Sequence, residues 1–154
     1  MREILFRGQT RKYGEKVRIG DGQKLPGRWV YGGVLQGVGS HSIIYGGENV
    51  NDPGENLDKW CVHTDTLGQF TGKTDKNGKK IFEGDIVRVL GNQQVDDWKN
   101  VDYVALIAFL DGGFCAIDGT VEEHGFRRYA LARMDFSLEI IGNQFDNPEL
   151  LENP

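Results

Sequence analysis

The chain has 154 residues, of which 38% are hydrophobic, and a formal net charge of −5. This length fits one domain or two small domains that bury a hydrophobic core. Twenty-two glycines without a repeating period exclude a collagen-like chain and favour tight turns between short strands. No apolar run reaches the roughly 20 residues of a membrane-spanning helix, and the N-terminus lacks the apolar core of a signal peptide. We therefore expect a globular cytoplasmic protein without membrane association.

The charges are unevenly distributed along the chain. Residues 1–28 contain eight basic and three acidic side chains, a net of +5, so the remaining chain carries −10. This division predicts either a basic face for nucleic acid or another acidic partner, or a basic arm that pairs with the acidic body of the same molecule. Glycines at positions 8 and 14 interrupt the basic segment, which favours strand ends and loops over a continuous basic helix.

The first half of the chain alternates short β-type segments with polar, glycine-containing connections. The predicted strands are Glu3–Gly8, Trp29–Leu35, His41–Gly46 and Trp60–Thr64, and the composition of Glu48–Leu57 predicts a turn or loop.

The segment from Leu67 to Val89 carries the strongest structural signal. Asn77-Gly78 favours a type I′ hairpin turn, in which both central residues have positive φ, and Asp75 can brace that turn through its side chain. Gly84-Asp85 predicts a bend that leads into a β-branched strand at Ile86–Val89. A hairpin followed by a bend and a hydrophobic strand is typical of small, strongly curved barrels.

The second half predicts further antiparallel strands. The expected elements are a polar loop at Asn92–Asn100, a strand at Val101–Leu110, a turn at 111–113, a returning strand at Phe114–Ile117, strands at Tyr129–Leu131 and Ser137–Ile141, and a short helical turn at Asn147–Leu151. We therefore predict a mainly β protein of short antiparallel strands. An N-terminal β-rich subdomain covers residues 1–66, and an SH3-like barrel with a C-terminal tail covers residues 67–154.

A series of motifs, taken in order, resembles the YopX-like family. These motifs are Met1–Ile4, Phe6–Gly8, Trp29–Gly32, Val62–Thr66, Gly68–Gly72, Asp75–Lys79, Phe82–Val87, Glu139–Asn143 and Asn147–Leu151. The resemblance implies a phage or prophage origin in bacteria and a β-rich fold with an SH3-like C-terminal part. It supplies no catalytic residue. The glycine-rich Gly32–Gly47 region and the Glu48–Asp58 segment depart from the family pattern and could shape a partner surface particular to this chain.

No residue pattern in the chain specifies a reaction. The three histidines, His41, His63 and His124, are scattered along the sequence, and the Cys61–His63 pair could hold zinc only with two further ligands. The same cysteine and histidine, with aspartates, are the remote basis for a hydrolase, but no nucleophile turn accompanies them. The sequence therefore predicts no catalytic residue, no cofactor and no metal site.

Binding is the function that the sequence favours. The leading hypothesis is protein–protein interaction or self-assembly into a homo-oligomer, with the protein partner unspecified, because short-stranded sheets commonly cover their edges by association. The second hypothesis is a nucleic-acid-binding protein that uses its basic N-terminal segment and the tip of the Asn77-Gly78 hairpin. Its candidate contact residues are Arg2, Arg7, Arg11, Lys12, Lys76, Lys79, Lys80, Trp29 and Tyr31.

Overall fold

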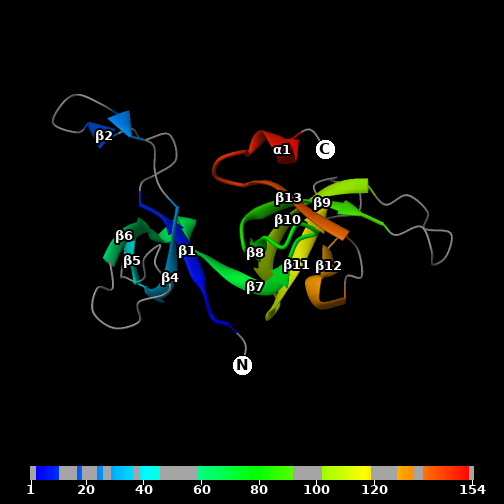
Figure 1. Cartoon of the computed structure of the whole chain (residues 1–154), viewed down its shortest axis with the longest axis horizontal. Coiled ribbons are helices and arrows are strands. Elements are labelled where there is room, and N and C mark those ends of the chain that lie inside the picture. The colour runs from blue at the N-terminus through cyan, green and yellow to red at the C-terminus, as the bar shows by residue number, and fades with distance from the viewer. Residues whose placement is uncertain are drawn as a thin grey trace. The chain divides into compact units, whose positions relative to one another are not determined.

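The structure is a computed structural model that describes residues 3–10, 17–18, 24–25, 29–36, 39–45, 59–91, 102–118, 128–133 and 137–152 (Figure 1). The predicted loops at Glu48–Leu57 and Asn92–Asn100 lie outside these residues. The chain forms two compact units, Met1–Phe70 and Thr71–Pro154. Within the ranges given, no helix is long and apolar enough to cross a membrane.

The first unit is built on an antiparallel sheet with the strand order β6-β5-β4-β1-β7. Alternation along the strands directs one set of side chains inward, where Val30, Ile44 and Val62 form a buried cluster. The elements of this unit are β1 (Phe6–Gln9), β2 (Val17–Arg18), β3 (Lys24–Leu25), β4 (Trp29–Leu35), β5 (His41–Tyr45), β6 (Lys59–His63), the short 3-10 helix η1 (Thr64–Thr66) and the start of β7 (Gly68–Thr74).

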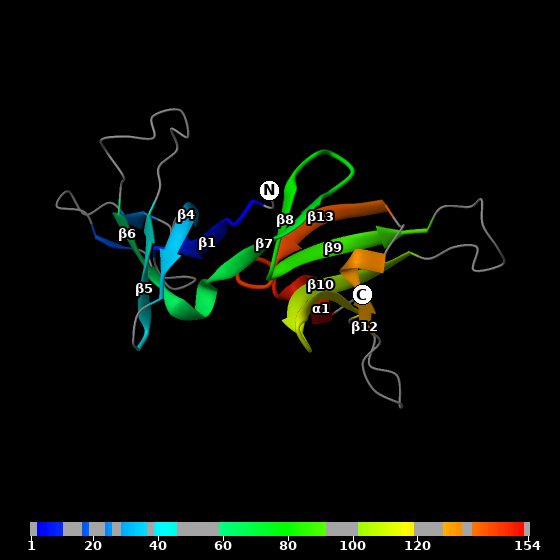
Figure 2. The ribbon, with the colours of Figure 1, turned by 90° about the horizontal axis from the view of Figure 1, so that it is seen from below.

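The second unit contains a sheet with the strand order β12-β11-β10-β9-β13, in which every pairing is antiparallel (Figure 2). Its core gathers Ile81, Val87, Val89, Ala105, Ile107, Ala116, Leu131 and Leu138. Its elements are the end of β7, β8 (Lys80–Phe82), β9 (Asp85–Leu90), β10 (Asp102–Leu110), β11 (Gly113–Asp118), β12 (Arg128–Ala130), the 3-10 helix η2 (Leu131–Arg133), β13 (Ser137–Asn143) and α1 (Glu149–Glu152).

The predicted fold class is confirmed: the chain is mainly β, its sheets are antiparallel, and a one-turn helix lies near the C-terminus. The sheet of the second unit is compatible with an SH3-like barrel, but among the described residues its outer strands β12 and β13 do not pair, so the barrel is not closed. The short helix α1 contacts β10.

The turn at Asn77-Gly78 differs from the prediction. Of the described non-glycine residues only Asp111 has positive φ, so Asn77 does not adopt the conformation that a type I′ turn requires. Instead, the Gly78 amide donates to the Asp75 carbonyl, the Asp75 amide donates to the Lys79 carbonyl, and Gly78 has φ +80°. These contacts describe a three-residue loop that ends in a left-handed glycine. The Asp75 carboxylate favours this longer loop because it accepts amide hydrogens from inside it.

The type I′ geometry occurs instead between β10 and β11. Leu110 pairs with Gly113, which leaves Asp111 and Gly112 as the two turn residues, and their φ angles are +51° and +80°. Aspartate and glycine are among the residues that tolerate these angles best. The predicted antiparallel return of the chain at this point is confirmed.

Candidate functional site

The sheet of the first unit has one side directed away from its hydrophobic cluster, and we call this side the open face. Register assigns its members, because residues directly opposite one another on paired strands share a face. Arg7 lies opposite Tyr31, Leu35 opposite Ile43, and His41 opposite His63. By this register the open face includes Arg7, Gln9, Trp29, Tyr31, Gly33, Leu35, His41, Ile43, Tyr45, Cys61 and His63.

Aromatic and apolar side chains are exposed on the open face. Tyr31 keeps 46% and Leu35 keeps 57% of its surface accessible. Gly33 lies between them on β4, and a Cβ added to it would meet no atom within 4 Å. Tyr31, Gly33 and Leu35 thus form an exposed apolar strip along β4, with an aromatic ring at one end.

Arg7 is not exposed, although an arginine that binds phosphate would need to be. Its side chain is buried, and its guanidinium carbon lies 4.6 Å from the centre of the Trp29 ring. A guanidinium at this distance from an indole face gains cation–π stabilisation. Three predicted contact residues, Arg7, Trp29 and Tyr31, thus lie together on β1 and β4, while Arg2, Arg11 and Lys12 lie outside the described residues.

Two of the three histidines meet across β5 and β6. The rings of His41 and His63 lie 4.8 Å apart between centroids and are tilted by 41°. His124 lies outside the described residues. Sequence reasoning missed this pair, since 21 intervening positions separate its members and only the register of the strands brings them together.

Cysteine is among the residue types most often buried, which led us to expect a buried thiol at Cys61, but this expectation is wrong. The thiol is exposed, because alternation along β6 directs Val62 into the core and Cys61 to the open face. Cys115 in the second unit is half-buried. In the parts of the chain that the structure describes, no three histidine, cysteine or acidic side chains come together as metal ligands.

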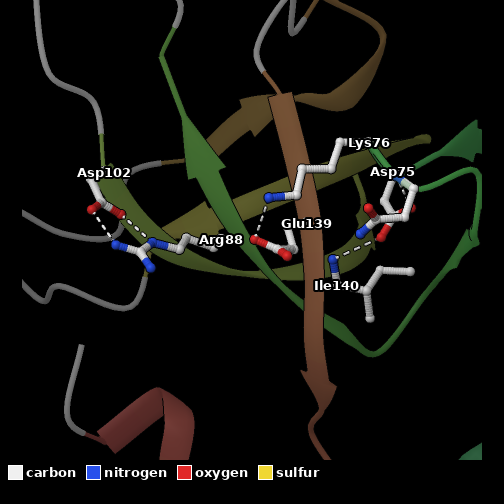
Figure 3. A network of polar contacts seen from close by, with 7 residues as sticks. Asp75, Lys76, Arg88, Asp102, Glu139 and Ile140 are labelled. Atoms are coloured by element: carbon white, nitrogen blue, oxygen red, sulfur yellow. Dashed lines mark hydrogen bonds and ion pairs between the residues drawn. The ribbon is translucent and has the colours of Figure 1, made fainter.

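The hairpin lysines of the nucleic-acid hypothesis belong to the second unit. Lys76, Lys79 and Lys80 are all exposed, and the Lys76 ammonium lies 2.8 Å from the Glu139 carboxylate on β13 (Figure 3). The site residues predicted for nucleic acid therefore occur on both units, one group on the open face and one on this hairpin.

Asp75 fixes the hairpin to β13. Its Oδ1 accepts the Asn77 and Lys79 amides at 2.8 and 2.9 Å, and its Oδ2 accepts the Ile140 amide at 3.2 Å (Figure 3). The Lys76 amide adds a bond to the Leu138 carbonyl at 2.8 Å. Burial alone would raise the pKa of Asp75, but the amide hydrogen bonds from Lys79, Ile140 and Asn77 outweigh it and lower the pKa below its usual value.

Further along the same sheet, a bidentate ion pair joins β9 and β10. The Arg88 guanidinium donates to both Asp102 oxygens, at 2.7 and 2.5 Å (Figure 3). These hydrogen bonds raise the pKa of Arg88 and lower that of Asp102. The pair is solvent-exposed, so it is screened and adds little to stability.

Several residues of the family-like motifs have structural roles. Asp85 accepts the buried Phe82 amide at 2.8 Å, across a turn in which Gly84 has φ +88°. Asn143 accepts the Phe145 and Asp146 amides at 3.0 Å each and so shapes the turn before α1. These side chains satisfy backbone groups and so hold the two turns.

Comparison with known proteins agrees with the resemblance seen in the sequence. No curated protein is significantly similar to the chain. A crystal structure of protein EF1440 from Enterococcus faecalis aligns over 98% of this chain and 99% of that one, with 20% identity and a TM-score of 0.43. The model of the family described as YopX protein matches residues 34–152. That match covers most of the chain, which therefore belongs to the YopX family.

Proposed function

We propose that the chain is an accessory protein of a phage or prophage that acts in the bacterial cytoplasm by binding another protein or a second copy of itself. In this proposal it has no catalytic activity. The observation that carries the proposal is the exposed pair of Tyr31 and Leu35 on the open face. Contiguous exposed apolar surface commonly marks an interaction site, and tyrosine is enriched among the residues that dominate binding energy.

An exposed side of a sheet suits a protein surface better than a small molecule, because small-molecule sites are concave. Gly33 removes a side chain from the middle of the strip, so a partner could approach the β4 backbone closely. Arg7 and Trp29, stacked beside the strip, hold one border of it. Half-buried Ile43 on β5 extends the apolar area across the next strand.

The test is size-exclusion chromatography with light scattering on the full chain, followed by the same measurement on the double variant Tyr31→Ser, Leu35→Ser. If the open face mediates self-assembly, the parent elutes as a discrete oligomer and the double variant as a monomer. The matched control is Ile141→Ser, which removes an exposed apolar side chain from the second unit. A parent oligomer that survives the double variant, or that Ile141→Ser dissociates equally, would contradict this form of the proposal.

Nucleic-acid binding is the second candidate. It is supported by Trp29 and the exposed Tyr31 on the open face and by the exposed lysines of the β7–β8 hairpin, since aromatic rings stack on bases while cations neutralise phosphates. Arg7 is buried and therefore does not add to this support. The acidic total charge opposes it. Comigration with single-stranded DNA or RNA at low salt, reversed by added salt and weakened in Lys79→Ala, Lys80→Ala, would favour this function over the first.

A further inference from the structure

His41 and His63 lie directly opposite each other on the paired strands β5 and β6. The Thr64 amide donates to the Ser40 carbonyl at 2.9 Å, so Ser40 and Thr64 form a hydrogen-bonded pair of the antiparallel ladder. The next pair, His41 and His63, is then of the non-hydrogen-bonded kind, in which opposed side chains approach most closely. This register explains the 4.8 Å separation of the rings.

The strand ends that carry the two histidines are held in place by further hydrogen bonds. The hydroxyls of Ser42 and Thr64 lie 2.8 Å apart, which joins β5 to η1 beside the pair. The Thr66 hydroxyl donates to the His63 carbonyl at 2.7 Å and accepts the Gln9 amide at 2.9 Å. A pair of ligands on a backbone fixed in this way loses little freedom when it binds an ion.

A hydroxyl also orients one of the two rings. Ser40 Oγ lies 2.9 Å from Nδ1 of His41. When Nδ1–H donates to this oxygen, the lone pair is on Nε2, which is the nitrogen left to bind a metal. Such outer hydrogen bonds are typical partners of metal-binding histidines, because they select the tautomer and fix the ring orientation.

We propose that His41 and His63 chelate one borderline divalent transition metal ion of the nickel, copper and zinc class. Imidazole suits these ions, and metal–nitrogen distances of about 2.0–2.1 Å require the two nitrogens to lie about 3 Å apart. The ring centroids lie 4.8 Å apart, which is close enough for side-chain rotation to reach this spacing. Water completes the coordination, since the described residues supply no third ligand of the histidine, cysteine or acidic kind. His41 is exposed and His63 half-exposed, so the ion enters directly from solvent.

The probe is Ni²⁺ alone, because it does not oxidise the exposed thiol of Cys61 on the same strand. Isothermal titration of the untagged, full-length, metal-free chain should show one Ni²⁺ bound per chain. His41→Ala and His63→Ala should each abolish this binding, and Ser40→Ala should weaken it about tenfold. The matched control is His124→Ala, which removes the remaining histidine of the chain and should leave binding unchanged.

Circular dichroism of each variant verifies its fold. If His63→Ala unfolds, the proposal is tested with His41→Ala and His41→Gln, because the exposed His41 can be substituted with less effect on the fold. Absence of Ni²⁺ binding by the parent would overturn the proposal. So would binding that persists in folded His41→Ala, or binding that is lost in His124→Ala.

Discussion

Asp75→Asn should destabilise the second unit, because it can replace the acceptor oxygen Oδ2 with an NH2 donor. That oxygen joins the β7–β8 hairpin to β13. An asparagine oxygen in the place of Oδ1 can still accept the Asn77 and Lys79 amides. The amide nitrogen in the place of Oδ2 then faces the Ile140 amide, so two donors meet where the carboxylate accepts at 3.2 Å. The hairpin would lose a bond to β13 as well as a negative charge.

The magnitude follows from the number and kind of bonds. Hydrogen bonds to charged groups contribute about 1.5–3 kcal/mol each, and one bond at 3.2 Å falls at the lower end of this range. Weakening of the other two bonds on loss of the charge adds to this, so we expect Asp75→Asn to lower the free energy of unfolding by about 2 kcal/mol at neutral pH. Asp75→Ala removes all three acceptor contacts and should cost more.

The assay is urea denaturation of the parent and the Asp75→Asn variant across a range of acid pH. The pKa of Asp75 is lowered in the folded state, so its ionised form contributes stability above the ordinary carboxyl pKa. That contribution is lost as pH falls below about 4, toward the folded value. The difference between parent and variant should therefore be largest at neutral pH and shrink in acid. Asp111→Asn is the control, since this exposed turn residue has positive φ, which asparagine tolerates, and it loses only a solvent-exposed ion pair with Arg128. Equal stability of parent and Asp75→Asn at neutral pH, or an unchanged difference in acid, would refute the reasoning.

Three further substitutions or titrations test the packing and the turns. Gly8→Ala places a Cβ 2.9 Å from Val62 Cγ2, so urea denaturation should show a loss of about 1–3 kcal/mol, whereas Gly33→Ala, which faces open space, should leave stability nearly unchanged. In Gly112→Ala the added Cβ would contact no atom, but the alanine would have to adopt φ +80°. Thermal denaturation should show a loss of about 1 kcal/mol in the free energy of unfolding, and Gly112→Asn should lose less. Burial, together with the neighbouring charges, raises the pKa of Tyr103 to about 12. An alkaline absorbance titration should therefore show one phenol that ionises late, and Tyr103→Phe should remove it. The free energy of unfolding should fall as pH rises above about 10, because the phenol of the unfolded chain loses its proton at lower pH than that of the folded chain.

Local patterns in the sequence predicted the strands well and the contacts between distant segments poorly. The β-branched strand at Ile86–Val89 and the return at Asp111-Gly112 are encoded within a few residues, and both occur as expected. Asn77-Gly78 carries an equally strong local signal but adopts another turn. The difference comes from Asp75: its Oδ1 accepts the Asn77 and Lys79 amides within the hairpin, and its Oδ2 accepts the Ile140 amide, 65 positions away. A sequence read in short windows contains no information about that partner.

The same limit explains the candidate site. The pairing of His41 with His63 depends on the register of β5 against β6, and one residue of slip would direct one ring into the core. The exposure of Cys61 follows from the same register, although the general tendency of cysteine toward burial predicted the reverse. Charge counting identified Arg7 as a candidate ligand contact, but it could not show that this side chain is buried against Trp29.

The distribution of structural and exposed residues bears on how function could vary within this fold. Asp75, Asp85 and Asn143 belong to motifs that carry the family resemblance, and each satisfies backbone amides that hold a turn. Leu35 and His41 belong to none of these motifs, and both are exposed on the open face. Substitution of a residue that holds a turn should lower stability, whereas substitution of an exposed side chain on β4 or β5 should change stability little. If the open face is the binding surface, substitutions there should alter partner or metal binding while the urea midpoint stays near that of the parent.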